Sequence, residues 1–279
     1  FPSFFLFPKS MGEVFPAIFC ECEVCKKARE RGGKNVRTRS QALIDDTILI
    51  DLPADTYMHC LNGLPIEKLH TCIITHSHGD HLYAVELLNR GPGMARVVFD
   101  DKPFNMYGTA PSMRFVRDAI NRSRLDTCNR VSANVIAPFE PFEAEGYKIT
   151  PLKAVHDVYS SPVIYALEKD GKSMLYAHDT GIFAEETFDY IEKNNMHFDF
   201  VSLDCTFCDS PNDWLGHMSI GNCNTVRDRL NKIGCTNANT VFVVNHFSHN
   251  NEHALYDDLK PIAEENGYII SYDGLEIEF

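Results

Sequence analysis

The stretch Thr75-His76-Ser77-His78-Gly79-Asp80-His81 decides how the rest of the sequence is interpreted. It follows the apolar segment 71–75, which predicts a strand, and it precedes a segment that predicts a helix. Three imidazoles and one carboxylate within six positions are ligands that zinc, iron and manganese ions accept. On a loop at a strand end the first two histidines point the same way, whereas the aspartate and the last histidine turn toward a neighbouring point. This arrangement favours two adjacent metal ions over one, and over a solvated histidine-rich loop.

Short β-branched runs recur around this stretch in groups, with helical patterns between the groups. Strands are predicted over 43–52, 71–75, 95–99, 147–153, 163–168, 173–176, 200–204, 240–245 and 268–272. Helices are predicted over 25–31, 81–89, 113–121, 185–194, 220–232 and 252–266. This order favours an α/β (α+β) fold, either a layered αββα sandwich or an α/β sheet.

The chain shows no internal repeat and no low-complexity linker. We therefore expect residues 1–279 to form a single domain, with a cysteine-rich segment at about 20–25 near the N-terminus. The stretch 100–130 contains two prolines and alternating basic and apolar residues. It is interpreted either as an insertion over an active site or as a surface helix with loops.

The charge and composition of the chain limit its classes of partner. There are 26 Lys and Arg against 39 Asp and Glu, for a net charge of −13. A balance this negative repels phosphate backbones, so broad nucleic-acid binding through a basic face is not expected. No run approaches the roughly 18 apolar residues of a membrane span, so no membrane association is expected. Most of the ten cysteines are scattered, as thiols in a reducing compartment are, which favours the cytoplasm.

The histidine stretch resembles the His-x-His-x-Asp-His signature of the metallo-β-lactamase-fold hydrolases, whose fold is an αββα sandwich. Later segments, each at the end of a predicted strand, match the remaining ligands of that family in the same order. The resemblance implies that a first metal is held by His76, His78 and His156. It implies that a second metal is held by Asp80, His81 and His246, and that Asp179 bridges the two. The metals are expected to be divalent zinc, manganese or iron.

Taken alone, His156 and His246 are more often satisfied polar residues than ligands. Because the first motif is intact and the later segments follow in the family's order, we expect both histidines to be metal ligands. His178 is left out, because strand alternation points it to the face opposite Asp179. Two aspartates are expected to position ligands rather than to bind metal: Asp51 and Asp157.

A cluster of cysteines resembles one branch within this family. Cys20-Glu-Cys22-Glu-Val-Cys25 resembles the branch that contains the phosphoribosyl cyclic phosphate phosphodiesterase of phosphonate degradation, the PhnP-like branch. In that branch three such cysteines bind a structural zinc together with a histidine three residues after the last active-site histidine. The resemblance therefore implies that His249 is the fourth ligand of a structural zinc. The alternative is a set of reduced, metal-free thiols.

A further pair of residues resembles a motif of this branch and, more distantly, of tRNase Z, the tRNA 3′-processing endonucleases. The segment Gly216-His217-Met218-Ser219 carries the histidine, and Asp204 at a strand end is its acidic partner. A carboxylate bonded to one ring nitrogen raises the pKa of the imidazole, so that His217 can donate a proton or bind a phosphate oxygen. The alternative is a histidine that caps the helix over 220–232. The nearby Cys205-Thr-Phe-Cys208 lacks a thioredoxin-like context, which favours buried thiols over a redox pair.

The resemblance implies a dinuclear metal-dependent hydrolase, first of all a phosphodiesterase that cleaves a small, cyclic or linear, sugar or nucleotide phosphodiester. A hydroxide bridging the metals is then the nucleophile, and the catalytic residues are His217, Asp204 and Asp80. The alternatives are a tRNA 3′-end endonuclease, a lactonase or thioesterase, and a non-catalytic protein of cofactor biosynthesis. A long Gly/Pro- and Lys-rich arm that would grip tRNA is not found, so no stable nucleic-acid partner is expected. A homodimer is expected, because relatives are often dimers.

Overall fold

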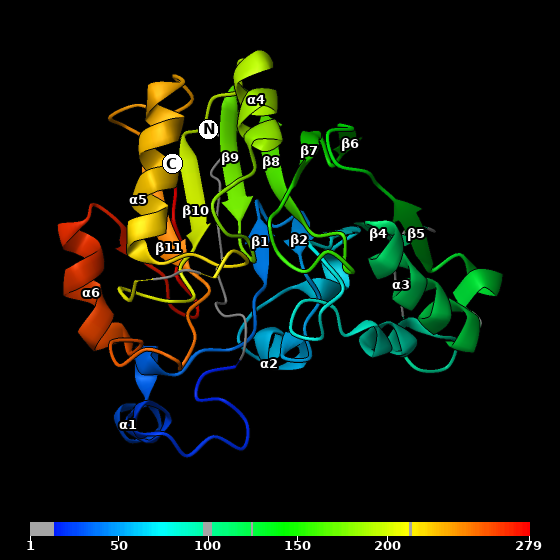
Figure 1. The fold of residues 1–279 in the computed structure, drawn as a ribbon. Coiled ribbons are helices and arrows are strands. Elements are labelled where there is room, and N and C mark those ends of the chain that lie inside the picture. The colour runs from blue at the N-terminus through cyan, green and yellow to red at the C-terminus, as the bar shows by residue number, and fades with distance from the viewer. Residues whose placement is uncertain (1–13, 97–101, 124, 212–213) are drawn as a thin grey trace.

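The computed structural model describes residues 14–96, 102–123, 125–211 and 214–279, and it contains two β-sheets flanked by helices (Figure 1). The first sheet has the strand order β1 (Ala42–Ile44), β2 (Ile48–Ile50), β3 (Thr71–Ile73), β4 (Phe104–Gly108) and β5 (Val131–Val135). The second has the order β12 (Ile269–Ile270), β11 (Val241–Asn245), β10 (Phe200–Asp204), β9 (Lys172–Ala177), β8 (Val163–Lys169), β7 (Tyr147–Lys153) and β6 (Phe142–Ala144). The α-helices are α1 (Glu23–Arg31), α2 (Thr56–Leu61), α3 (Ala110–Ser123), α4 (Glu185–Lys193), α5 (Ile220–Lys232) and α6 (Tyr256–Glu265).

The direction of the strands brings several loops to one end of the sandwich. Strands β9, β10, β11 and β12 run parallel, so the loops that follow them meet at one edge of the second sheet. The end of β3 in the first sheet faces this edge. The hydroxyl of Tyr165 in β8 donates a hydrogen bond to the carbonyl of Ile74 over 2.7 Å, and the amide of Val163 donates to the carbonyl of Thr75 over 3.0 Å. The histidine stretch that begins at Thr75 is therefore held against the second sheet.

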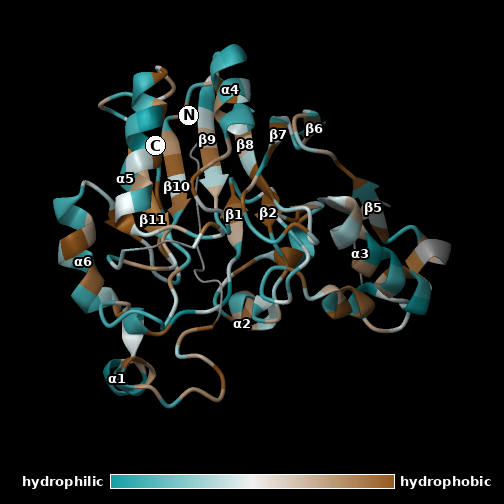
Figure 2. Ribbon diagram, in the orientation of Figure 1, coloured by the Kyte–Doolittle hydropathy of each residue, from teal (hydrophilic) through white to brown (hydrophobic). Residues whose placement is uncertain are grey.

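Strand alternation divides the apolar residues among three cores. Ile48 of β2 packs with Tyr165 of the second sheet, whereas its neighbour Leu49 packs with Met113 of α3. The side chain of Leu175 in β9 points away from the first sheet and is buried beneath α4 and α5. Figure 2 shows hydrophobic residues concentrated on the strands between these layers. The order helix, sheet, sheet, helix confirms the predicted αββα sandwich.

The interpretation of 100–130 needs correction. Strand β4 lies between β3 and β5, and α3 covers the outer face of the same sheet. The stretch therefore contains a surface helix, as one of the two interpretations expects, together with an internal strand that was not predicted, and it is not an insertion over the active site. Strands β5 and β6 were not predicted, because their side chains are largely half-exposed and give no clear alternation. Most of the strand predicted over 95–99 lies outside the described residues.

The helix predicted over 81–89 is also different in the structure. A 3-10 helix, η3, covers Ala84–Arg90 only. The preceding backbone is engaged with the end of β2, because the Leu52 amide donates to the carbonyl of His81 and the Tyr83 amide donates to the carbonyl of Leu52. Other 3-10 turns are η1 (Gly33–Asn35), η2 (Ile66–Lys68) and η4 (Leu125–Cys128). Across the described parts of the chain, none of the helices has the length and apolar character needed to cross a membrane.

Candidate metal centre

Three histidines form a first cluster where the loop after β3 meets the loop after β7. The ring centroids of His76 and His78 lie 4.4 Å apart. The ring centroid of His156 lies 5.1 Å from that of His76 and 5.0 Å from that of His78. Nε2 of His156 approaches Nδ1 of His78 to 3.3 Å. The three side chains thus present nitrogens to one point, as the sequence predicts for the first metal.

A second cluster lies beside the first and contains Asp80, His81 and His246. Nε2 of His81 lies 3.4 Å from Nε2 of His246 and 3.5 Å from Oδ2 of Asp80. The carboxylate of Asp179, which follows β9, lies between the clusters. Its Oδ2 is 2.6 Å from His81 Nε2 and 2.7 Å from His246 Nε2, and its Oδ1 is 3.5 Å from His156 Nε2. The structure therefore brings all seven predicted ligands together.

The outward-facing nitrogens of these rings are held by acceptors. His81 donates from Nδ1 to the carboxylate of Asp51 over 2.7 Å, and His156 donates from Nδ1 to the carbonyl of Gly216 over 3.0 Å. The Thr206 hydroxyl donates to the His246 carbonyl, so Nδ1 of His246 is the donor in its 2.8 Å bond to that hydroxyl. When the proton is held on Nδ1, the neutral ring has a lone pair on Nε2 that can bind a metal. Each of these rings is therefore prepared to bind a cation.

The remaining atoms of the clusters fit a metal in the same way. Nε2 of His76 is buried and, within the described structure, has no hydrogen-bond partner. His78 turns Nε2 toward Asp157, 3.3 Å away, and turns Nδ1 toward the cluster. Buried acceptors that face one another are unfavourable unless a cation lies between them. The donor set, three histidines on one side and two histidines with two carboxylates on the other, suits divalent zinc, iron or manganese.

The pKa shifts of the side chains in the two clusters also favour a bound cation. Burial lowers the pKa of His76 well below its usual range, which keeps this ring neutral. Burial raises the pKa of Asp179, but His246, His81 and His76 outweigh that effect and hold the pKa well below its usual range. Burial also lowers the pKa of His81, and the carboxylates of Asp179 and Asp51 overcome it and raise that pKa well above normal. The buried carboxylate of Asp179 is therefore stabilised by positive charge on its neighbours. A divalent cation at this place would supply that charge in place of the proton on a histidine ring.

Three positions at this site have left-handed backbone. Asp51 (φ 65°) and His246 (φ 63°) directly follow β2 and β11, and Asp179 (φ 51°) lies two residues after the end of β9. A non-glycine residue in this region costs roughly 1–2 kcal/mol. Left-handed backbone also occurs at other turns of the chain, so it is not confined to the site. At these three positions the cost is borne by residues whose side chains lie in the clusters or contact a cluster residue.

A cavity of about 340 Å³ opens over the two clusters, and His217 forms part of its wall. His217 donates from Nδ1 to the buried carboxylate of Asp204 over 2.9 Å. Burial lowers the pKa of His217, but Asp204, Asp179 and Asp80 outweigh it and raise the pKa to about 9. The structure thus brings His217 and Asp204 together as the sequence predicts, at the wall of the cavity.

Two threonines at the site were missed by the sequence interpretation. The hydroxyl of Thr206 lies 3.1 Å from His217 Nδ1 and 2.8 Å from His246 Nδ1, so it links these two rings. The hydroxyl of Thr75 lies 3.0 Å from both carboxylate oxygens of Asp51. Thr75 directly precedes His76 and Thr206 follows Asp204 by two residues, and this closeness to predicted site residues is the signal that could have found them.

The segment before His217 packs directly on the loop after Asp179. A Cβ placed on Gly181 would lie 1.7 Å from the carbonyl oxygen of Leu215. No side chain fits in that space, so only glycine allows the two backbones to approach this closely. The contact fixes Gly216, whose carbonyl accepts the hydrogen bond from His156.

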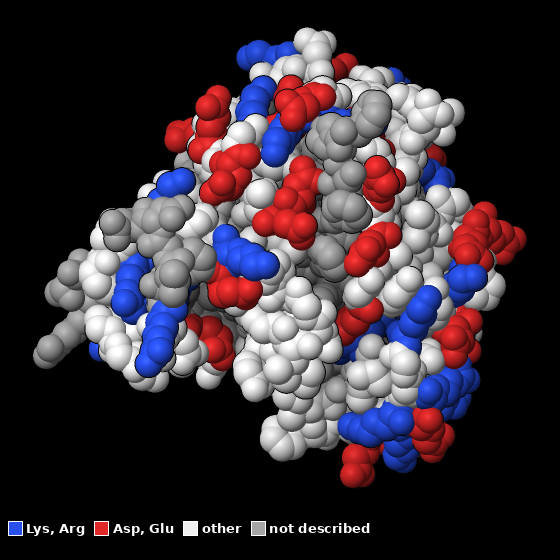
Figure 3. Space-filling view, turned by 180° about the vertical axis from the view of Figure 1, so that it is seen from behind, with Lys and Arg blue, Asp and Glu red and all other residues white. Residues whose placement is uncertain are grey.

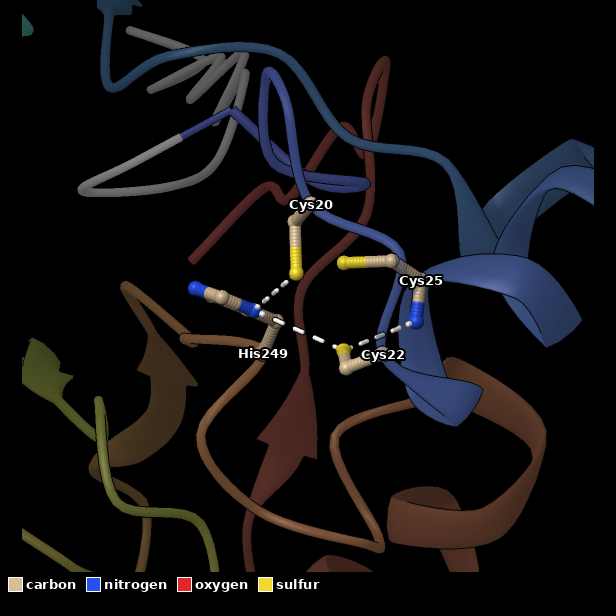
Figure 4. A group of neighbouring side chains, drawn as sticks. All are labelled: Cys20, Cys22, Cys25 and His249. Atoms are coloured by element: carbon tan, nitrogen blue, oxygen red, sulfur yellow. Dashed lines mark hydrogen bonds between the residues drawn. The ribbon is translucent and has the colours of Figure 1, made fainter.

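The predicted cysteine cluster forms at the other end of the His246 loop (Figure 4). Nδ1 of His249 lies 3.2 Å from the sulfur of Cys20 and 3.7 Å from that of Cys22, while the Cys25 amide donates to the Cys22 sulfur over 3.4 Å. Burial raises the pKa of Cys22, but the bonds to its sulfur outweigh burial and lower the pKa to about 6. Burial raises the pKa of Cys25 to about 12. Three sulfurs and one imidazole around one point are the donor set of a structural zinc.

Residues 47–243 match the family described as the beta-lactamase superfamily domain. The chain belongs to the beta-lactamase superfamily. This confirms the family predicted from the histidine stretch. The comparison with curated proteins gives no match.

Solved structures of this fold superimpose on nearly the whole chain. A diphosphatase from the PhnP family has a TM-score of 0.72 and 18% identity, covering 99% of this chain and 97% of its own. Zn²⁺-bound PqqB from Methylobacterium extorquens has a TM-score of 0.72 and 16% identity, covering 99% of both chains. The short form of human tRNase Z has a TM-score of 0.65 and 14% identity, covering 98% of both chains. At these identities the likeness establishes the superfamily fold.

Two other sequence interpretations can be compared with the structure. Cys205 and Cys208 are fully buried free thiols, and burial raises both pKa values well above the usual range. Such thiols are poor nucleophiles, in line with the interpretation as buried residues. His178 lies outside the clusters of possible metal ligands found among the described residues, and its Nε2 lies 2.7 Å from the hydroxyl of Ser202. Leaving His178 out of the ligand set agrees with this geometry.

Replacing Cys22 with serine is expected to lower the melting temperature by about 5–10 °C, because a structural zinc contributes directly to folding and serine is a weak zinc ligand. Calorimetry on the metal-loaded protein measures the shift. Cys128→Ser, at a thiol outside the cluster, is the matched control and is expected to change the melting temperature by less than about 2 °C. An unchanged melting temperature for Cys22→Ser would count against a structural metal at this cluster.

Proposed function

We propose that this protein is a metal-dependent hydrolase with two divalent ions in the active site and one structural zinc at the cysteine cluster. The observation that carries the proposal is the convergence of seven ligand side chains on two neighbouring points, beside a buried Nε2 of His76 that has no hydrogen-bond partner in the described structure. The proposed ligands of the active-site ions are His76, His78, Asp80, His81, His156, Asp179 and His246. The proposed ligands of the structural zinc are Cys20, Cys22, Cys25 and His249.

Two divalent ions held by these ligands would lower the pKa of a bound water molecule and offset negative charge on the substrate. The chain's own residues would orient the reaction. Asp80 lines the cavity beside His81, where its carboxylate can accept a proton from the attacking water. Asp204 accepts the hydrogen bond from His217 Nδ1 and favours the charged form of this ring. In our proposal His217 donates a proton to an oxygen of the substrate or of the leaving group.

We further propose that the substrate is a small phosphodiester. A cationic His217 opposite the metal clusters suits the negative charge that develops on the oxygens of phosphorus. The PhnP-family neighbour is described as a diphosphatase and another neighbour as a tRNase Z, so phosphorus chemistry occurs on this fold. A carbonyl ester is the competing substrate, because the same ions can activate water toward carbon.

Large nucleic acids are less suited than small diesters. The net charge of the chain is −13, and the face in Figure 3 shows acidic and basic side chains interspersed without an extended basic stripe. The small-diester proposal therefore relies on local charge inside the cavity rather than on attraction over the surface.

Hydrolysis assays of cyclic and linear phosphodiesters, a lactone and a thioester test the proposal, each with Zn²⁺ and with Mn²⁺. We expect turnover of a small phosphodiester to exceed that of both carbonyl esters by at least about tenfold, and we expect no cleavage of precursor tRNA. Preference for a carbonyl ester would refute the phosphodiesterase assignment while leaving the hydrolase in place. Processing of precursor tRNA at its 3′ end would favour the endonuclease.

A further inference from the structure

A short segment before β1 contains two buried polar side chains that the proposed chemistry does not use. Ser40 and Gln41 are buried, and neither belongs to a cluster of possible metal ligands. A carboxamide has two N–H donors and an acceptor oxygen, and inside a protein these groups need partners. The partners of Gln41 lead to one of the two active-site clusters. The inference rests on the proposed function, because it concerns how one of the two metal positions is built.

The carboxamide of Gln41 is fixed in one orientation. Its Nε2 donates to the backbone carbonyl of Asp51 over 2.9 Å and to the hydroxyl of Thr56 over 3.0 Å. Its Oε1 accepts a hydrogen bond from Nδ1 of His59 in α2. A backbone carbonyl can only accept, so turning the carboxamide over would set two acceptor oxygens against each other at Asp51. Gln41 therefore holds this carbonyl through a bond that no other orientation of the side chain provides.

The carbonyl that Gln41 holds belongs to a peptide that is also tied to His81. On the other side of that peptide, the Leu52 amide donates to the backbone carbonyl of His81 over 2.8 Å. The carboxylate of Asp51 accepts from Nδ1 of the His81 ring over 2.7 Å. The backbone and the ring of His81 are thus both held by the two residues that share this peptide.

The position of Asp51 depends on such contacts, because its backbone is left-handed. The Asp51 amide donates to the carbonyl of Ile73, and the carboxylate accepts from the amide and the hydroxyl of Thr75. The other donor that the structure places at the Asp51 carbonyl is the thiol of Cys72, at 3.8 Å, which is a weak donor. The carboxamide of Gln41 is therefore the main support of this carbonyl.

We infer that Gln41 is a positioning residue for the metal of the second cluster. By fixing the peptide after Asp51, it directs Nε2 of His81 toward the point that this ring shares with the other ligands of the cluster. The first cluster is linked to Asp51 less directly, through the Thr75 hydroxyl, which lies 3.1 Å from Nδ1 of His76. Loss of the Gln41 carboxamide is expected to weaken the second metal position more than the first.

Titration of Gln41→Met with Co²⁺ tests the inference without turnover. Cobalt accepts the nitrogen and oxygen ligands that zinc accepts, and its visible absorption reports binding. After mild chelation has removed the active-site metals, we expect the wild type to bind two Co²⁺ ions. Methionine has nearly the length of glutamine but donates no hydrogen bond. We expect the variant to bind one of these ions at least about tenfold more weakly and the other within about threefold of the wild type.

Two further variants separate positioning from a general loss of stability. Gln41→Glu keeps an oxygen toward His59 and lacks the donor to Asp51, so it is expected to show the same selective loss. Ser40→Ala is the matched control, because the Ser40 hydroxyl is also buried and lies 3.1 Å from that of Tyr176, a residue outside both clusters. We expect Ser40→Ala to lower the melting temperature by a few degrees and to leave both Co²⁺ affinities unchanged.

The outcomes distinguish the inference from the proposed function. Unchanged Co²⁺ affinities in Gln41→Met, equal weakening of both ions, or the same selective loss in Ser40→Ala would overturn the inference. If Gln41→Met does not fold, Gln41→Glu is judged by the same criteria. Binding of fewer than two ions by the wild-type protein would instead contradict the proposed function.

Discussion

Replacing Asp179 with asparagine is expected to reduce hydrolysis by about 10²–10⁴-fold and to remove the active-site metals. The carboxylate is the only group within 2.7 Å of both His81 Nε2 and His246 Nε2 among the contacts of the described residues, and it also faces the first cluster. The variant would lose the carboxylate shared by the two clusters, and a 10²–10⁴-fold loss of rate corresponds to about 3–5 kcal/mol of activation free energy. Metal analysis by mass spectrometry is expected to find about three ions per wild-type chain and about one per variant chain, at the cysteine cluster.

Asp170→Asn provides a matched control for this variant. Asp170 has the same residue type and nearly the same left-handed backbone (φ 50° against φ 51°), but it is exposed at the turn between β8 and β9. We expect its metal content and activity to equal those of the wild type. Full retention of three ions by Asp179→Asn would contradict a bridging role for this carboxylate.

Replacing His217 with alanine is expected to lower kcat for a phosphodiester by about 10²–10⁴-fold, while both active-site metals stay bound. His217 lies 3.9 Å from Asp179 Oδ1 and belongs to a further group of possible ligands with Asp179, Asp204 and His246, but its Nδ1 donates to Asp204. It therefore acts on the substrate in our proposal, not on the metals. Steady-state kinetics and metal analysis on the same sample separate these roles.

His253→Ala is the matched control for His217→Ala. His253 also pairs through Nδ1 with an aspartate, Asp209, over 2.7 Å, but it is not part of the cavity wall. We expect this variant to keep wild-type kinetics. Loss of active-site metal from His217→Ala would instead identify His217 as a ligand.

The sequence was most informative where residue type and strand position act together. His76, His78 and His81 share one short loop, and Asp179 and His246 follow buried strands, so their convergence required only that parallel strands end at one edge. The cysteine cluster was predicted from the family resemblance, which implies a fourth ligand three positions after the last active-site histidine, here His249. Its contact with Cys20 joins segments 229 residues apart and depends on tertiary packing.

The parts that could not be predicted depend on tertiary contacts. Strand β4 has an ordinary composition, and only its pairing with β3 and β5 makes it internal to the sheet. The roles of Thr75 and Thr206 follow from hydroxyls that reach a second residue, which spacing alone does not reveal. The close approach of Leu215 to Gly181 is likewise visible only when two distant loops are placed together.

The left-handed backbone at Asp51, Asp179 and His246 has a consequence for engineering. Glycine adopts this conformation without steric cost, so glycine would relieve about 1–2 kcal/mol of backbone strain at each position. It would also remove a side chain whose buried partners are then left unpaired, and breaking such a buried charged pair costs about 3–5 kcal/mol. Heat resistance and ion retention therefore depend on the same three side chains, and a library screened for either property is expected to keep them.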